Sequence, residues 1–285
     1  MVKQAGSALV LGAALVGCGL GEGFATATPD ETAPEDAQEQ TQSAAASARA
    51  PGADAGGARP APRVDRGEGD GADVVSLGDS YMRLPNLVQQ PGSEGVDVSL
   101  AAIGGKAYRT YAYTGAVLLP PKPVGVKNGV IPGQLAAALR DGADIATVIV
   151  SGGANDLGQG SPCNGAKSVA EVAPACKQEL DGIVAAVDAF VGQLAAAGVE
   201  DLVWVGYGPT ATTGDRVVEG AIAYLRADRK AKCVPDDPAL GLRCHYVDNV
   251  DAAIPTRDGF LPTSEGYEAI ARAVLARMKE VGARR

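Results

Sequence analysis

The sequence predicts an α/β domain in which helices cover both faces of a parallel five-stranded sheet. Short apolar runs alternate with amphipathic stretches through residues 72–285, and such alternation is typical of a parallel sheet. The run 145–150 is rich in β-branched residues, as in a strand buried on both faces. Residues 178–197 place their apolar side chains at spacings of three and four, which predicts a helix with one buried face.

The remaining elements follow from local signals. The stretch 93–103 fits a helix or a strand, and we favour a helix because Gly104-Gly105 supplies a C-cap and because parallel strands need a crossover. Pro132 stands near the start of a second helix. In chain order the predicted strands are 74–77, 108–113, 145–150, 202–205 and 245–247, and the predicted helices are 93–103, 131–140, 178–197, 217–232 and 265–278.

The N-terminus has the pattern of an export signal. Lys3 precedes an apolar run over 5–17 that is too short to span a membrane. The run ends in Leu-Val-Gly-Cys at 15–18, which resembles a bacterial lipobox, and the resemblance implies cleavage before Cys18 and lipidation of Cys18. An ordinary secretory signal with an incidental Cys18 is the alternative. We therefore expect a signal peptide over 1–18 and a protein anchored by lipid in the bacterial cell envelope, on the outer membrane or the periplasmic face.

Residues 19–71 form the predicted linker between this anchor and the folded domain, 72–285. The segment is rich in Ala, Gly, Pro, Ser and acidic residues, and its only large apolar side chains are Leu20, Phe24 and Val64. Such a composition cannot bury enough apolar surface to offset the entropy of ordering. The sequence therefore predicts a disordered tether.

Composition narrows the classes of partner. The formal net charge is −9 and aromatic residues make up 4% of the chain, so a nucleic-acid partner is not expected. The single histidine excludes a multi-histidine metal site. We expect no metal and no organic cofactor, and we expect a monomer.

Four cysteines beyond Cys18 have the spacing of local disulfides. Of the three possible connectivities, Cys163 with Cys176 and Cys233 with Cys244 is the simplest, and an exported protein permits it. A Cys₄ zinc site is the alternative, but the sequence has no C-x-x-C pair.

Candidate site residues follow the ends of three predicted strands. Ser80 ends the sequence Gly-Asp-Ser after the first strand, where the carboxyl ends of parallel strands form a ligand crevice. It is a candidate nucleophile, although Gly, Asp and Ser also dominate ordinary turns. Asn155 follows the third strand and can aim its amide into the same crevice, as an oxyanion donor must. Gly115, after the second strand, can offer a backbone N–H.

Taken together, these stretches resemble the SGNH (GDSL) hydrolase family. The resemblance rests on four motifs in the family's order: Gly-Asp-Ser at 78–80, a glycine after the second strand, Gly-x-Asn-Asp at 153–156, and an Asp-x-x-x-Pro block at 258–262. It implies a flavodoxin-like three-layer sandwich with Ser80 as nucleophile. Gly115 and Asn155 would join the Ser80 N–H as oxyanion donors, with Gly104 or Gly105 as alternatives to Gly115. Asp258 would orient the general base.

The chain departs from the family pattern at that base. The family histidine lies three residues after the aspartate, and this chain has Leu261 there. Leucine cannot accept a proton, and His245 is expected at the start of a strand, away from the crevice.

The resemblance predicts an envelope-tethered ester hydrolase with impaired turnover. Its substrate would be a small-molecule or carbohydrate-linked ester, with hydroxide or the substrate itself replacing the base. The alternatives are a non-catalytic lipoprotein that binds an acylated glycan in the former active-site crevice, and a structural lipoprotein.

Overall fold

The computed structural model describes most of residues 71–285. Three predictions lie outside the described residues: lipidation of Cys18, the linker up to residue 70 and the base-orienting role of Asp258. No helix within the described part is long and apolar enough to cross a membrane. The described residues are 71–84, 94–120, 129–142, 144–158, 160–208, 212–213, 216–234, 240–249, 254–257 and 259–285.

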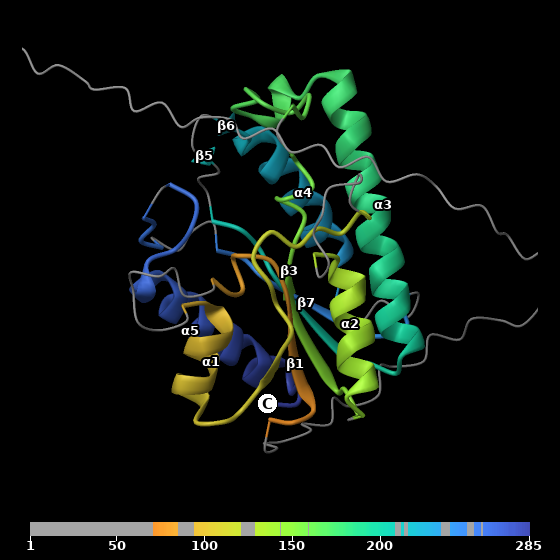
Figure 1. The fold of residues 1–285 in the computed structure, drawn as a ribbon, viewed down its shortest axis with the longest axis vertical. Coiled ribbons are helices and arrows are strands. Elements are labelled where there is room, and N and C mark those ends of the chain that lie inside the picture. The colour runs from red at the N-terminus through yellow and green to blue at the C-terminus, as the bar shows by residue number, and fades with distance from the viewer. Residues whose placement is uncertain are drawn as a thin grey trace, which may run out of the picture. The chain divides into compact units, whose positions relative to one another are not determined.

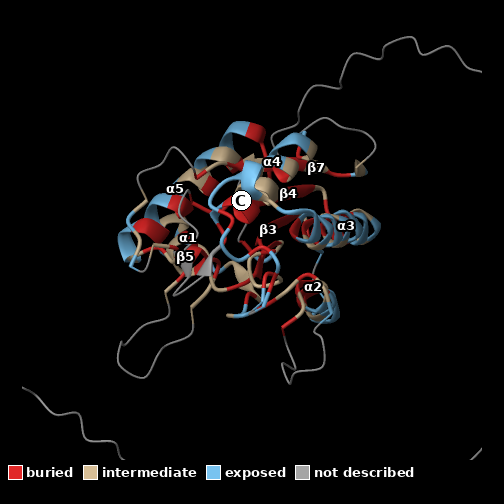
Figure 2. Ribbon diagram, turned by 90° about the horizontal axis from the view of Figure 1, so that it is seen from above, coloured by how far each residue is buried: buried red, intermediate tan, exposed pale blue. Residues whose placement is uncertain are grey.

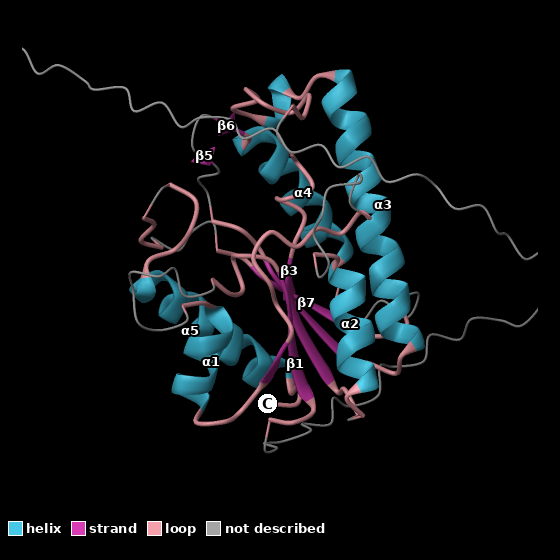
Figure 3. Cartoon of the chain, in the orientation of Figure 1, coloured by secondary structure: helices cyan, strands magenta, loops and turns pink. Residues whose placement is uncertain are grey.

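A five-stranded, all-parallel sheet forms the centre of the domain (Figures 1 and 3). Its strands stand in the order β2-β1-β3-β4-β7. They are β1 (Val74–Gly78), β2 (Arg109–Thr110), β3 (Thr147–Ser151), β4 (Asp201–Val205) and β7 (Arg243–Val247). Every residue of β1, β3 and β4 is buried, as expected where both faces are covered. The chain leaves β1 toward β2 on one side and returns to β3 on the other, which places a ligand crevice at their carboxyl ends.

Helices cover both faces of this sheet, so the predicted fold class is confirmed. Helices α1 (Val96–Gly104) and α5 (Ser264–Val281) pack together on one face. On the other face, α3 (Pro174–Ala196) packs against both α2 (Ile131–Arg140) and α4 (Glu219–Lys232) (Figure 1). Burial alternates around the helices, with exposed residues on their outer surfaces (Figure 2).

Several element boundaries differ from those predicted. The stretch 93–103 contains a helix, as favoured, but the second strand has two residues instead of six. The backbone beyond it still follows β1, because the N–H groups of Tyr111 and Tyr113 donate to the carbonyls of Ser76 and Gly78. Three short elements were not predicted: the 3₁₀ helix η1 (Val169–Glu171) and the antiparallel pair β5 (Thr212–Thr213) and β6 (Arg216–Val217).

The structure contains the two local disulfides predicted from the cysteine spacing. Cys163–Cys176 ties the loop after β3 to the first turn of α3. Cys233–Cys244 ties the end of α4 to β7. Each closes a loop of about a dozen residues, and a crosslink of this span restricts the unfolded chain by roughly 3 kcal/mol.

Candidate active site

A tight turn at the end of β1 sets the position of Ser80. Gly78 has φ +127°, and a Cβ there would overlap the carbonyl oxygen of Ser151. The side chain of Gln134 holds the same residue from α2. Its Oε1 accepts from the Gly78 N–H at 2.6 Å and its Nε2 donates to the Gly78 carbonyl at 2.9 Å. The turn is therefore specified by backbone conformation and by a buried amide together.

Asp79 and Tyr207 join this turn to the loop after β3. The Tyr207 hydroxyl donates to Asp79 Oδ2 at 2.6 Å and accepts from the Ala154 N–H at 3.2 Å. The other carboxylate oxygen accepts from the Tyr81 N–H at 2.9 Å. Burial raises the pKa of Asp79 to about 6, against the opposing effect of these hydrogen bonds. Burial also raises the pKa of Tyr207, so its hydroxyl stays protonated as the donor.

The raised pKa of Asp79 predicts a pH-dependent loss of stability. The folded chain holds more protons than the unfolded chain between the ordinary pKa, 3.8, and about 6. The free energy of unfolding therefore falls as the pH rises through this window. In urea unfolding, we expect the free energy of unfolding of Asp79→Asn to rise relative to that of the wild type by up to roughly 3 kcal/mol between about pH 4 and pH 7.

The control for this experiment is Asp144→Asn, which removes an exposed carboxylate. Its profile should run parallel to that of the wild type. Parallel profiles for Asp79→Asn and the wild type would show that Asp79 titrates alike in both states, contrary to the prediction.

Ser80 lies half-buried just past this turn. Its hydroxyl has no hydrogen bond to any described residue, and its carbonyl accepts from the Tyr267 hydroxyl at 3.3 Å. Tyr267 stands in the first turn of α5, so the start of the last helix lies beside the candidate nucleophile. The hydroxyl of Ser80 is therefore available to a substrate at the carboxyl edge of the sheet.

The two candidate oxyanion loops lie side by side at this edge. Asn155 Nδ2 donates to the Ala116 carbonyl at 3.0 Å, next to Gly115, whose φ is +79°. Asp156 holds the same loop through the N–H groups of Leu118 and Leu119, at 2.9 and 2.8 Å. The structure thus brings Gly115 and Asn155 together, and one amide hydrogen of Asn155 is left for an oxyanion.

The alternative glycines lie at the opposite edge. Gly105 caps the end of α1, and that helix runs back from the carboxyl edge toward the strand starts. A Cβ at Gly71, three residues before β1, would touch Lys106. Gly104 and Gly105 therefore lie at the edge opposite the turn after β1, whereas Gly115 lies at the same edge as that turn.

Leu261 occupies a preformed turn before α5. Thr256 and Pro262 form an antiparallel bridge, and the Arg257 N–H donates to the Leu261 carbonyl at 2.9 Å. The neighbouring Phe260 packs its ring against Tyr81 and Tyr207, with centroids 6.0 and 5.5 Å apart. The turn that carries Leu261 is thus anchored to residues next to Ser80.

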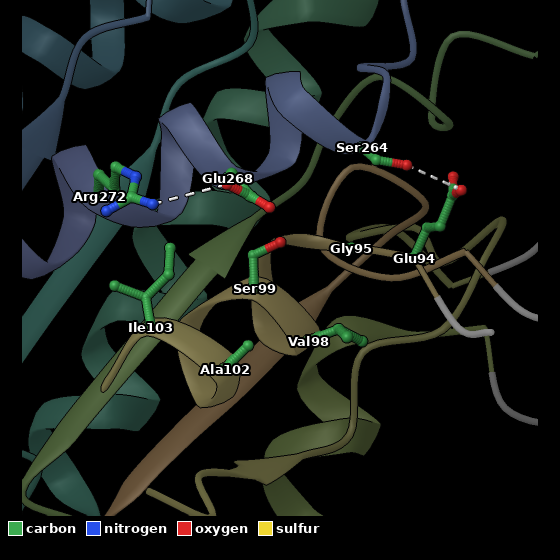
Figure 4. A pocket seen from close by; sticks show the side chains of 9 residues that line it. All are labelled: Glu94, Gly95, Val98, Ser99, Ala102, Ile103, Ser264, Glu268 and Arg272. Atoms are coloured by element: carbon green, nitrogen blue, oxygen red, sulfur yellow. Dashed lines mark hydrogen bonds and ion pairs between the residues drawn. The ribbon is translucent and has the colours of Figure 1, made fainter. Parts of the chain in front are cut away.

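Glu94 holds this turn from the other side. Its carboxylate pairs with Arg257 and accepts from the Ser264 hydroxyl at 3.1 Å (Figure 4). Glu94 also stands at one end of a groove of about 500 Å³ between α1 and α5, where Glu268 pairs with Arg272. These contacts fix the start of α5 relative to α1.

The single histidine does not reach this site. His245 lies in the middle of β7, whereas the sequence placed it at the strand start, and its Nε2 is 2.8 Å from Asp201 Oδ1. Both side chains are fully buried. Three strand spacings, roughly 14 Å, separate β7 from β1. His245 is therefore a structural histidine. In the described residues no group of three His, Cys, Asp or Glu side chains is placed to hold a metal.

Sequence reasoning missed the residues that support the site: Gln134, Tyr207 and Tyr267. Gln134 interrupts the apolar face of α2, and a buried polar residue of this kind needs a partner. Tyr207 comes two residues after β4 and so reaches the same edge as Ser80. Both signals were present in the sequence, but neither indicates which residue of another element the side chain contacts.

Comparison with solved structures identifies the fold. No protein-family model matches the chain, and no curated protein matches it. Two carbohydrate acetylesterase structures from Sinorhizobium meliloti superimpose with TM-scores of 0.51 and 0.50, at 15% and 14% identity. They cover 73% and 72% of this chain, and 98% and 97% of their own chains. An inhibitor-bound aryl esterase from M. smegmatis gives a TM-score of 0.49 at 13% identity, over 73% of this chain and 98% of its own.

The two S. meliloti likenesses show the fold. The described domain is an α/β three-layer sandwich with a parallel five-stranded sheet. More particularly, it has the fold of the two carbohydrate acetylesterase structures, with its candidate nucleophile just past the carboxyl end of β1.

Proposed function

We propose that this domain is an SGNH-type ester hydrolase with Ser80 as nucleophile, and that its turnover is impaired because Leu261 replaces the family base. The observation that carries the proposal is the convergence of Ser80 with the loops of Gly115 and Asn155 at one edge of the sheet. The Asp79–Tyr207 contact supports it, because it ties the two sides of the crevice together.

The chemistry follows the serine-hydrolase pattern. The Ser80 oxygen attacks the ester carbonyl carbon, and the carbonyl oxygen becomes an oxyanion that the N–H groups of Ser80 and Gly115 and the Asn155 amide stabilise. The leaving alcohol departs and an acyl-Ser80 forms. Water then attacks this acyl group, releases the acid and restores the serine hydroxyl.

Proton transfer is the weak step in this scheme. The Ser80 proton must leave and the alcohol must gain one, and Leu261 offers neither base nor acid. In the proposal hydroxide or a group of the substrate takes the proton. Removing the base of another serine hydrolase cost a factor of about 10⁶ in turnover, with roughly 10³–10⁴ over water remaining.

A fluorophosphonate probe tests the proposal directly. We expect slow, stoichiometric labelling of Ser80, because attack on phosphorus uses the same nucleophile and oxyanion donors. Mass spectrometry of tryptic peptides should place the adduct on Ser80, and Ser80→Ala should remove it. Labelling of another residue, or none in a folded protein after prolonged exposure, would contradict the assignment of Ser80.

For the substrate we propose a short acyl group, such as acetate, carried on a carbohydrate. The two S. meliloti structures bear the name carbohydrate acetylesterase, and this chain shares their fold, with Ser80 just past the carboxyl end of β1. Comparing the hydrolysis rates of acetyl, butyryl and octanoyl esters of 4-nitrophenol would show which length of acyl chain the site prefers.

A second candidate function is non-catalytic binding of an acylated glycan. The observation that favours it is His245, because the one imidazole in the chain is committed to Asp201 in the sheet. In this case an acylated ligand would bind with its carbonyl at the Gly115–Asn155 loops, and the Ser80→Ala variant would bind it as tightly as the wild type.

We also propose that Cys18 carries a lipid and that residues 19–71 tether the domain to the cell envelope. The support is the Leu-Val-Gly-Cys sequence at 15–18. Expressed in a bacterium with its own leader, the protein should incorporate labelled fatty acid and partition into detergent. Cys18→Ser should lose the label and appear in the soluble fraction. A Cys18→Ser protein that remains in membranes would contradict the lipobox.

A further inference from the structure

A groove of about 470 Å³ runs along the outer edge of the sheet beside the candidate active site. We call it the edge groove. One wall is the backbone extension of β2, the edge strand, and the other is α2. Its volume falls in the range of sites that bind small molecules. Its lining includes Tyr111, Tyr113, Gly133, Gln134, Ala137 and Arg140.

The first wall presents two tyrosines. Tyr111 and Tyr113 are two residues apart on an extended backbone, so both side chains point to the same side with a spacing of roughly 7 Å. The Tyr111 hydroxyl donates to Asp141 at 2.5 Å, which fixes its ring. Tyr113 is 49% exposed, and its hydroxyl has no partner among the described residues.

The second wall leaves room for a ligand. Gly133, Ala137 and Arg140 recur at spacings of four and three, which places them on one face of α2. A Cβ built on Gly133 meets no atom within 4 Å, so this face is open. The exposed Arg140 and Asp141 carry opposite charges at its far end, so the pair brings no net charge.

Two residues of the groove contact the turn that carries Ser80. Gln134 lines it and holds both backbone groups of Gly78, two residues before the serine. The Tyr113 N–H donates to the same Gly78 carbonyl at 2.9 Å. The Tyr113 end of the groove is therefore the end next to the turn of Ser80.

We infer that the edge groove binds the glycan part of the ester substrate, with neutral sugar rings stacked on Tyr113 and Tyr111. The negative face of an aromatic ring attracts the polarised C–H bonds of a sugar. Hydroxyl groups of the sugar meet the donors and acceptors of Arg140 and Asp141. A neutral, polar ligand with flat apolar faces fits this mixture better than an acyl chain, which calls for a wall without charges.

The inference rests on the proposed function for its link to Ser80, but its test does not require chemistry. Binding is measured by calorimetry on the full-length protein that carries the Ser80→Ala substitution, so that no ester can be hydrolysed through Ser80. The probes are four neutral tetrasaccharides: xylotetraose, cellotetraose, mannotetraose and chitotetraose. We expect saturable binding of at least one of them. No saturation by any of the four up to about 10 mM, ten times a millimolar Kd, would overturn the inference.

Variants of the groove separate stacking from apolar contact. Tyr113→Phe keeps the ring and should bind within about twofold of the parent, whereas Tyr113→Leu should bind about five- to tenfold more weakly. Gly133→Leu should block the groove. Tyr224→Leu, on α4 and outside the groove, is the matched control and should not change binding. Equal binding by Tyr113→Leu and Tyr113→Phe would overturn the stacking and indicate an apolar groove for an acyl chain.

The outcomes distinguish this inference from the proposed function. Oligosaccharide binding with the predicted variant pattern, together with no fluorophosphonate adduct on Ser80, would leave the groove assigned and the hydrolase rejected. An adduct on Ser80 without oligosaccharide binding would leave the hydrolase standing and reject the glycan groove.

Discussion

Leu261→His is expected to raise ester hydrolysis at least ~10²-fold. In the proposed site the nucleophile and the oxyanion donors already stand at one edge of the sheet, and the substitution would supply the base that the proposal lacks. The turn that carries position 261 is held by the Thr256–Pro262 bridge and by the Arg257 backbone, so the imidazole would enter a preformed backbone. The gain should stay below the full ~10⁴–10⁶, because the surroundings have not been tuned to a histidine.

The measurement is turnover of 4-nitrophenyl acetate as a function of pH. The gain should appear as the pH rises through about 6–7, where an imidazole loses its proton. Leu261→Asn is the matched control, since it adds polarity without a base and should give no gain. Ser80→Ala added to Leu261→His should abolish it. A folded Leu261→His protein with no gain would mean that the crevice lacks more than its base.

Wild-type turnover at ordinary enzyme rates, roughly 1–10³ s⁻¹, would overturn the impaired-hydrolase proposal from the other side. The His245→Ala variant then decides the matter. If that activity survives the loss of the only histidine, another group serves as base, and Leu261 is not a defect.

Gly78→Ala is expected to destabilise the domain by roughly 3–5 kcal/mol, because a strained backbone and a steric overlap add. At φ +127° a side chain is disfavoured, and the new methyl group would overlap the Ser151 carbonyl of β3 and press on Met82. Neither the neighbouring strand nor the buried turn can move aside easily. Thermal unfolding should shift down by roughly 6–20 °C.

The Gly142→Ala variant separates the cost of backbone strain from the cost of steric overlap. Gly142 has φ +81°, and a Cβ there meets nothing within 4 Å, so only the backbone cost of about 1–2 kcal/mol applies. The difference between the two variants measures the close approach of β1 and β3. Equal shifts for both variants would show that the overlap is relieved and that the turn is less constrained than its geometry indicates.

Local signals in the sequence were enough to predict most of the fold. The helix 131–140 begins and ends where Pro132 and the apolar spacing placed it, because these signals act within one or two turns. The predicted ends of strands were wrong where pairing with a neighbouring strand decides where a strand begins and ends. The edge strand β2 is shorter than its apolar run, and β7 begins two residues earlier than predicted.

The sequence by itself indicated the candidate nucleophile, the candidate oxyanion residues and the leucine at position 261, because each is a residue type at a fixed place in a motif, and it favoured the local pairing of the four cysteines by their spacing. Only the tertiary structure shows which edge of the sheet Gly104, Gly105 and Gly115 each reach. The same holds for Tyr207, which joins Asp79 to the loop of Asn155 across 128 residues of chain, and for the edge groove. Such contacts depend on how strands and helices pack, and no local pattern encodes the partner of a side chain that lies on another element.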